Sequence, residues 1–274
     1  MAGILYVVGT PIGNLSDFSP RAVETLKTCD FIAAEDTRVT RKLLNKFEIQ
    51  KPAVSYYEHN RKESGEKILE RLLQGESCAL VTDAGMPAIS DPGEDLVNLC
   101  HGAGVKVESV PGPTAFATAM AMSGLPSGRF TFEGFLSVNK PSRREHLSSL
   151  QDEQRTMIFY EAPHKLAATL KDMFEAFGDR EIALIKELTK IHETVERTTL
   201  GAAAEKYAEV APKGEFVIVL RGAEKKVETW TLERAIAYAK ELNLGGKSKS
   251  EAAKLAAKQS GIKKSDIYKG IEED

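Results

Sequence analysis

The sequence predicts an α/β protein with two sheet-containing domains and a small helical module at its C-terminal end. Short apolar runs alternate with amphipathic stretches over the first 125 residues, which is typical of βαβ units and a largely parallel sheet. From residue 130 to 222 strand patterns dominate, and from Leu232 onward the pattern is helical and rich in lysine. We therefore expect domains at residues 1–125, 130–222 and 228–274.

The first domain opens with an apolar strand at residues 4–8, and helix and strand patterns then alternate. Two helix starts are marked by a capping side chain before a proline, at Ser19-Pro20 and at Asp91-Pro92. Strands separated by helices in this way favour parallel pairing. The segments, in chain order, are "SPRAVETLKTCD", "FIAAEDT", "RVTRKLLNKF", "AVSYYEHN", "ESGEKILERLLQG", "SCALVTDAG", "DPGEDLVNLCHGAG" and "VKVESV".

The second domain begins after the linker "GLPSGRF" and has a different order of elements. Its expected strands are "FTFEGFL", "RTMIFYEA", "REIALIKELT", "HETVERTTL" and "GEFVIVL", with only two or three helices among them. Between residues 182 and 200 one strand follows another without a helix, which predicts that part of this sheet is antiparallel.

The C-terminal segment combines short helical patterns with positive charge. Eight lysines and three acidic residues lie between Lys240 and Gly270, so the local net charge is +5, whereas the whole chain carries −3. Such a segment is either a solvated appendage that aids solubility or a module that docks on RNA phosphates.

The composition excludes several classes of protein. An apolar fraction of 42% and a charged fraction of 28% are typical of a soluble globular protein. The cysteines at positions 29, 78 and 100 form no CxxC, which fits a reducing compartment and argues against a disulfide scaffold. The apolar start is too short and lacks the basic lead of a signal peptide, and no run approaches a membrane span. We expect a cytoplasmic protein that does not enter a membrane.

Three loops rich in glycine and proline each follow an expected strand. They are "GTPIGN", "TDAGMPAISDPG" and "PGPTA". Ligands of open parallel sheets bind at the carboxyl ends of the strands, so three such loops predict a small-molecule site. We expect the "GTPIGN" turn to remove side-chain bulk at the floor of this site, so that a ligand lies against the backbone.

Several common site types are excluded by their missing motifs. The chain has no GxxxxGK[ST] phosphate loop and no GxGxxG dinucleotide fingerprint. It has no HExxH, and its five histidines lie far apart in the sequence, so we expect no metal site.

Two polar clusters follow expected strands in the first domain. Glu35, Asp36 and Arg38 stand together in "AAEDTR", and His59 and Asn60 end "YYEHN". These residues are either a helix cap with surface charge or the rim of the cleft that the three loops form. The segments "FYEAPHK" and "KELTK" repeat this arrangement in the second domain.

Taken together and in order, these motifs resemble one bacterial family. They are "VVGTPIGNLSDFSPRAVETL", "AAEDTRVTRKLL", "YYEHN", "VTDAGMPAISDPG", "VPGPTA", "FYEAPHKL" and "KELTKIHET", and the resemblance spans residues 3 to about 222. The family is that of the small-subunit rRNA 2′-O-ribose methyltransferases that modify cytidine 1402 of 16S rRNA, within the tetrapyrrole methylase superfamily. The resemblance implies two α/β domains with S-adenosylmethionine between them, a homodimer, and 16S rRNA in the small ribosomal subunit as substrate. The lysine-rich tail is similar to the small helical C-terminal domain of many members.

The resemblance also implies a set of cofactor-binding positions. Tetrapyrrole-modifying relatives have GxGPGD in the first loop and GGDP in the second, where this chain has "GTPIGN" and "DAGMP". This departure points away from a tetrapyrrole substrate. The implied positions are Pro11 in the first loop, Asp83, Ala84, Gly85 and the flanking Pro87 in the second, Thr114 and Ala115 in the third, and Glu161, Leu188, Gly214, Glu215 and Phe216 in the second domain.

Methyl transfer from a sulfonium needs little covalent chemistry from the protein, so positioning supplies much of the rate. A ribose hydroxyl is a poor nucleophile, and a base or a polarising group should assist it. The candidates are Glu35, Asp36 and His59, with Glu187 as a further one, and the sequence does not rank them. The neighbouring Asn60 belongs to the same expected catalytic group, and Arg38 is suited to a phosphate.

Two other functions remain open at this point. The same fold could methylate a tetrapyrrole or a protein side chain, which would call for a large apolar pocket and no basic tail. A cofactor-sensing RNA-binding protein without turnover would bind the cofactor but transfer no methyl group.

Overall fold

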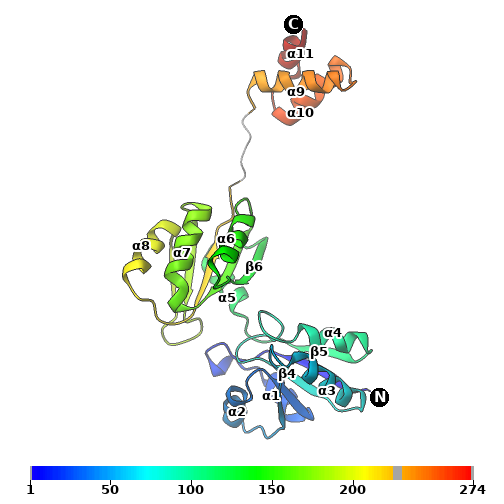
Figure 1. Ribbon diagram of the computed structural model, residues 1–274, viewed down its shortest axis with the longest axis vertical. Helices are drawn as coiled ribbons and strands as arrows, with labels where there is room; N and C mark the ends of the chain where they lie inside the picture. Colours follow the sequence, from blue (N-terminus) through cyan, green and yellow to red (C-terminus); the bar gives the residue numbers. More distant parts are fainter. Residues whose placement is uncertain (1, 225–229, 273–274) are drawn as a thin grey trace. The chain divides into compact units, whose positions relative to one another are not determined.

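The computed structural model describes residues 2–224 and 230–272, and its contacts divide the chain into two compact units between Ala223 and Glu224 (Figure 1). The first unit holds both sheets, and the second holds three helices. The division into domains at 1–125, 130–222 and 228–274 stays a prediction, and residues 228–229 and 273–274 of the last one lie outside the described residues.

The first sheet is parallel throughout, with strand order β3-β2-β4-β1-β5, as the alternation of strands and helices predicts. Strands β4, β1 and β5 are consecutive in this order, with β5 at the edge of the sheet, so the loops that follow these three strands emerge side by side at the carboxyl ends of the strands. The elements are β1 (Ile4–Val8), η1 (Leu15–Asp17), α1 (Pro20–Thr28), β2 (Phe31–Ala34), α2 (Thr37–Lys46), β3 (Ala53–Ser55), α3 (Arg61–Leu73), β4 (Cys78–Val81), α4 (Glu94–Gly102), β5 (Lys106–Val110) and α5 (Ala115–Ser123).

Both faces of the first sheet are buried at its centre, which explains why β2 and β4 are apolar at every position. In β2, Phe31 and Ala33 join a core that includes Leu72 of α3, whereas Ile32 and Ala34 join the opposite core. Helix layers on both faces therefore hold the sheet rigid beneath the loops at its carboxyl edge.

The second sheet is mixed, with strand order β6-β7-β10-β8-β9. Its β6–β7 pair is parallel and its other three pairs are antiparallel, which confirms the predicted antiparallel part. The elements are β6 (Phe130–Phe135), α6 (Lys140–Ser149), β7 (Thr156–Glu161), α7 (Pro163–Phe177), β8 (Glu181–Lys186), β9 (Thr194–Thr199), α8 (Leu200–Glu209) and β10 (Phe216–Leu220).

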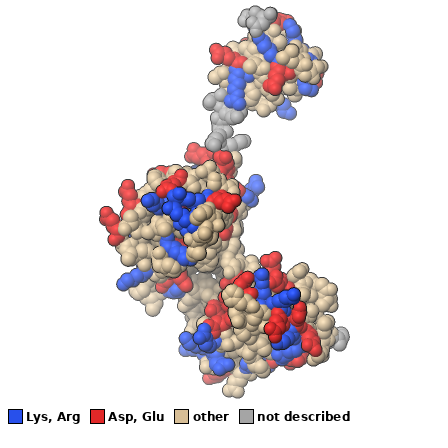
Figure 2. Space-filling model, in the orientation of Figure 1, with Lys and Arg blue, Asp and Glu red and all other residues tan. Residues whose placement is uncertain are grey.

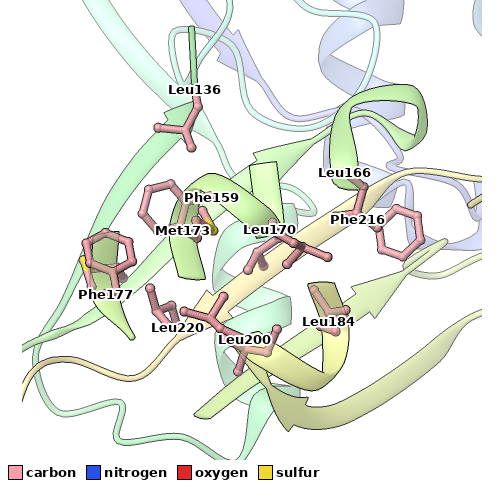
Figure 3. Close-up of a cluster of buried hydrophobic side chains, with 14 of the residues drawn as sticks. Leu136, Phe159, Leu166, Leu170, Met173, Phe177, Leu184, Leu200, Phe216 and Leu220 are labelled. Carbon is pink, nitrogen blue, oxygen red and sulfur yellow. The ribbon is translucent and has the colours of Figure 1, made fainter. Parts of the chain in front are cut away.

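Different helices cover the two faces of the second sheet. Figure 3 shows one core, in which Phe159, Leu184 and Phe216 of the strands meet Leu170 of α7. The opposite face is covered by α5, whose Ala119 belongs to a core with strand residues of this sheet. Because α5 follows directly on the loop after β5, that loop connects the edge of the first sheet to the second sheet.

The C-terminal unit consists of α9 (Leu232–Leu244), α10 (Lys249–Ser260) and α11 (Lys264–Glu272). Alanines such as Ala239 and Ala253 are fully buried at the contacts between these helices, and small side chains there allow close packing. Six lysines in and beside α10 and α11 are all exposed: Lys247, Lys249, Lys254, Lys258, Lys263 and Lys264. Within the residues described, no helix has the length and apolar character needed to cross a membrane.

One of the two predicted helix starts is wrong. Ser19 caps α1, as predicted, by accepting a hydrogen bond from the Ala22 N–H at 3.1 Å. The helix expected at Asp91-Pro92 instead begins at Glu94, after Gly93 with φ +152°. The chain turns at this glycine, and the Asp91 side chain is left for another role.

Candidate active site

A cavity of about 500 Å³ lies within the first unit, at the loops that leave both sheets. This volume falls in the range of small-molecule sites. The side chains that line the cavity include apolar groups from both sheets and a set of carboxylates. The lining residues are Ile12, Glu35, Thr82, Asp83, Ala84, Gly85, Met86, Ile89, Ser90, Asp91, Thr114, Ala115, Phe135, Tyr160, Glu161, Ala162, Pro163, His164, Ile185, Leu188, Glu215, Phe216 and Val217.

Backbone hydrogen bonds join the three glycine- and proline-rich loops into one platform. The Gly9 N–H donates to Val110 O at 3.0 Å, and Thr10 and Gly85 exchange hydrogen bonds of 2.9 and 3.2 Å. A methyl group on Gly9 would lie 2.6 Å from Gly112 Cα, closer than any real contact. Gly9 therefore allows the first loop to pack closely against the third. The sequence predicts that the glycines of this turn leave backbone exposed to a ligand, whereas the structure assigns Gly9 a different role. The residue of this turn that reaches the cavity is Ile12.

Unusual backbone conformations gather in the loops around the cavity. Of the five non-glycine residues with positive φ in the described chain, four lie in these loops: Ala88 and Ser90 at 65°, Glu187 at 52° and Thr189 at 65°. Such conformations cost about 1 kcal/mol or more each and persist only where the surrounding structure imposes them. The pair at 187 and 189 flanks Leu188, which lines the cavity.

Carboxylates form one wall of the cavity. The Thr82 hydroxyl donates to Glu35 Oε2 at 2.6 Å and lies within hydrogen-bonding reach of Asp91. Burial, and then the Glu35 charge, raise the pKa of Asp91 to about 6. Partial desolvation and Glu35 also raise the pKa of Asp83. In the part of the chain that the structure describes, no group of three or more potential ligands is arranged to hold a metal ion.

The second sheet contributes a buried carboxylate and a tyrosine. Glu161 at the end of β7 is 3% exposed and accepts hydrogen bonds from the Ala162 N–H at 2.9 Å and from the Thr169 hydroxyl. The Tyr160 hydroxyl accepts a hydrogen bond of 3.0 Å from the Phe116 N–H, in the first turn of α5. This contact satisfies one of the free N–H groups of the helix and fixes the third loop against the second sheet.

The loops before β10 and after β8 are tied to each other by ion pairs. Lys190 Nζ lies 3.0 Å from Glu187 and 2.9 Å from Glu215. Gly214, with φ +84°, leaves the space that the Glu187 side chain occupies. Glu187 is thus engaged in holding these loops together and does not line the cavity.

The cavity brings together nine of the twelve implied cofactor positions. The other three do not line the cavity. Pro11 and Pro87 are buried, and Gly214 leaves the space that the Glu187 side chain occupies. The role of all twelve in binding a cofactor stays a prediction. The nine that line the cavity are Asp83, Ala84, Gly85, Thr114, Ala115, Glu161, Leu188, Glu215 and Phe216.

Of the expected catalytic residues, only Glu35 lines the cavity. Asp36 caps α2 and pairs with the exposed Arg38 at 2.7 Å, and hydrogen bonds from Arg38 lower the pKa of Asp36 to about 2. His59 is exposed with its ring edge-on to Tyr57. Asn60 accepts from the Tyr57 N–H at 2.8 Å and shapes its own loop. For these residues the structure shows local roles, and a catalytic role stays a prediction.

Asp91 is the carboxylate lining the cavity that was not among the site residues predicted from the sequence. Its segment, "DAGMPAISDPG", does point to the site, but a residue before a proline is also a common helix cap. Only the conformation of Gly93 separates the two possibilities. Burial raises the pKa of the Asp91 carboxyl group to about 6, close to neutrality.

Known proteins place the chain in a family. Residues 4–204 match the Tetrapyrrole (Corrin/Porphyrin) Methylases. The chain is 46% identical to the Ribosomal RNA small subunit methyltransferase I of Synechocystis sp., over 97% of this chain and 96% of that protein. A protein of the same name from Thermotoga maritima is 47% identical, and its entire length matches 81% of this chain.

Solved structures agree with this assignment at the level of fold. A crystal structure of uroporphyrin-III C-methyl transferase from Thermus thermophilus, complexed with S-adenyl homocysteine, has a TM-score of 0.56 at 20% identity and covers 79% of this chain and 97% of its own. The resemblance found in the sequence motifs is confirmed: the chain belongs to the tetrapyrrole methylase family and, within it, to the ribosomal RNA small subunit methyltransferase I proteins.

Proposed function

We propose that this chain transfers a methyl group from S-adenosylmethionine to the ribose 2′-oxygen of cytidine 1402 in 16S rRNA of the small ribosomal subunit. The observation that carries the proposal is the cavity at the edge of both sheets, in a chain whose near-full-length relatives are named for methylating small-subunit rRNA. The S-adenyl homocysteine bound to a protein of the same fold, which is the demethylated form of the cofactor, supports the choice of cofactor.

The cavity has side chains that suit this cofactor. S-adenosylmethionine carries positive charge on its sulfonium and ammonium groups and has a flat adenine. Carboxylates such as Asp83 suit the cations, and the apolar Leu188 and Phe216 suit the adenine. When bound, the cofactor supplies an electrophilic methyl group.

The carboxylate wall supplies an acceptor for the ribose proton. In the transfer, the bond from the 2′-oxygen to the methyl carbon forms as the carbon–sulfur bond breaks, and the hydroxyl proton passes to a carboxylate. We assign this role to Asp91, since a base with a pKa of about 6 is ionised at neutral pH and still able to hold a proton. Thr82, whose hydroxyl donates to Glu35, lies beside the Asp91 carboxylate.

The decisive experiment for this function separates sugar from base methylation. The full chain is incubated with methyl-labelled S-adenosylmethionine and small ribosomal subunits from cells lacking the modification, and the rRNA is digested to nucleosides. We expect mass spectrometry to show 2′-O-methylcytidine. A methyl group on the base, or no transfer by a protein that binds the cofactor, would contradict the proposal.

The alternatives have less support. Structural neighbours that act on tetrapyrroles are related by fold alone, at about one-fifth identity or less. A cofactor sensor without turnover is excluded if label reaches the rRNA. The homodimer and the cytoplasmic location implied earlier stay predictions.

The C-terminal unit is proposed to dock on ribosomal RNA. Removing residues 228–274 should weaken binding to the subunit and flatten its salt dependence, because phosphate contacts release counterions. Cofactor affinity should be unchanged, since the cavity lies wholly within residues 12–217. Filter binding over a salt series, with calorimetry for the cofactor, measures both.

The Thermotoga maritima relative is shorter than this chain by a stretch about as long as the C-terminal unit. We therefore expect the truncated chain to retain methyl transfer at low salt. If it binds and methylates the subunit as well as the intact chain at moderate salt, the unit is a solvated appendage.

A further inference from the structure

Helix α2 presents a basic stripe that the activity described so far does not use. Thr40 and Leu44 are buried on one face of the helix. The exposed surface carries Arg38, Arg41, Lys42 and Lys46, and residues 37–46 contain no acidic side chain, so the helix has a net charge of +4. Figure 2 shows Lys and Arg side chains gathered over α2.

Most of this charge is not neutralised by neighbours. Arg38 pairs with Asp36, but within residues 2–224 no ion pair engages Arg41, Lys42 or Lys46. Positions 38, 42 and 46 are each one helical turn apart and therefore form a continuous row. At 1.5 Å per residue the row is about 12 Å long, which corresponds to roughly three nucleotide steps of a helical strand.

The row begins at the rim of the cavity. Glu35 lines the cavity, and the next residue, Asp36, donates its N–H to Asp83 Oδ1 at 3.3 Å. The helix therefore starts at the carboxylate wall and leads away from it. The carboxylates of the cavity repel the phosphate groups of an RNA strand. The exposed cations of α2, which begin at Arg38, attract them.

We propose that α2 binds the phosphate backbone of the RNA strand whose target nucleotide enters the cavity. The inference rests on the proposed function and adds to it the surface that holds the strand beside the target. The chemistry of the partner is that of a phosphodiester chain, because Arg41, Lys42 and Lys46 have no ion-pair partner within residues 2–224, whereas the core of a protein–protein interface is depleted of lysine. Such contacts position the strand without reading its sequence.

The test replaces Arg41, Lys42 and Lys46 together by glutamine and leaves Arg38 in place. We expect binding to unmodified small ribosomal subunits to weaken by about tenfold or more at moderate salt, and the slope of log affinity against log salt to fall by about 2. KM for the subunit should rise in proportion. The affinity for S-adenosylhomocysteine, measured by calorimetry, should remain that of the natural chain.

A matched control removes three exposed cations from the second half of the unit: Arg129→Gln, Lys140→Gln and Lys171→Gln. Equal losses in the two triple variants would show that only overall charge matters and would overturn the proposal. An α2 variant that keeps full subunit affinity but no longer binds vesicles of anionic lipid would also overturn it. If the natural chain methylates rRNA in either case, the proposed function stands and only the docking surface is wrong.

Discussion

Asp91→Asn is expected to lower kcat by about 100-fold or more while the affinity for S-adenosylhomocysteine changes little. Asparagine keeps the size of the side chain and can still bond to the Thr82 hydroxyl, but it cannot take the ribose proton. Steady-state kinetics on the ribosomal subunit and calorimetry with the cofactor product measure the two quantities separately.

The same variant should be more stable than the natural chain at high pH. The folded-state pKa of Asp91, about 6, lies above its ordinary value of 3.8, so protonated Asp91 stabilises the fold below about pH 4. This contribution is lost as the pH rises through 6. The pKa shift corresponds to about 3 kcal/mol at pH 8, and because Asp91 is only half buried, solvent screening reduces the cost of the charge to about 2 kcal/mol, which Asn removes. The difference in unfolding free energy should vanish near pH 4.

Asp95→Asn is the matched control, because this carboxylate is half exposed on α4, four residues away. It should leave kcat unchanged. Equal losses of kcat and cofactor affinity in Asp91→Asn would make Asp91 a binding or folding residue, and the proton acceptor would then be sought at Glu35.

The site was predictable from sequence where it depends on strand order and turn chemistry. Apolar runs such as "CALV" between amphipathic helices define a parallel sheet, and the carboxyl ends of its strands share one edge. The three loops rich in glycine and proline each follow one of these strands. They therefore lie together if the three strands are neighbours in the sheet. The order β4-β1-β5 satisfies this condition.

Other features of the site depend on contacts between distant parts of the chain, which no local sequence pattern encodes. Helix α5 is apolar on most sides, so its periodicity does not reveal that it covers the second sheet. The positive φ of Glu187 and Thr189 is imposed by the loops around them and contradicts their own preferences. Asp91 likewise carries the signature of a helix cap, and only Gly93 redirects it.

Gly9→Ala is expected to destabilise the protein by about 3 kcal/mol and to reduce turnover by roughly 100-fold. The added methyl group would lie 2.6 Å from Gly112 Cα and 2.7 Å from Met86 Sδ. Met86 can adjust, but the backbone of Gly112 cannot move freely, since hydrogen bonds hold Gly9 to Val110 and the next residue to Gly85. The loops must therefore separate, and Ala84, Gly85 and Thr114 at the cavity move with them.

Gly102→Ala provides the comparison, because this glycine lies in α4 and, apart from neighbouring atoms of the helix itself, nothing lies within 4 Å of the added methyl group. We expect this substitution to raise the free energy of unfolding by up to about 1 kcal/mol, because alanine has a higher helix propensity than glycine. Thermal unfolding and cofactor calorimetry on both variants separate a general effect of losing glycine from the effect of the contact between loops. A Gly9→Ala protein with natural stability and turnover would mean that the loops can part without cost, and the platform would then not position the site.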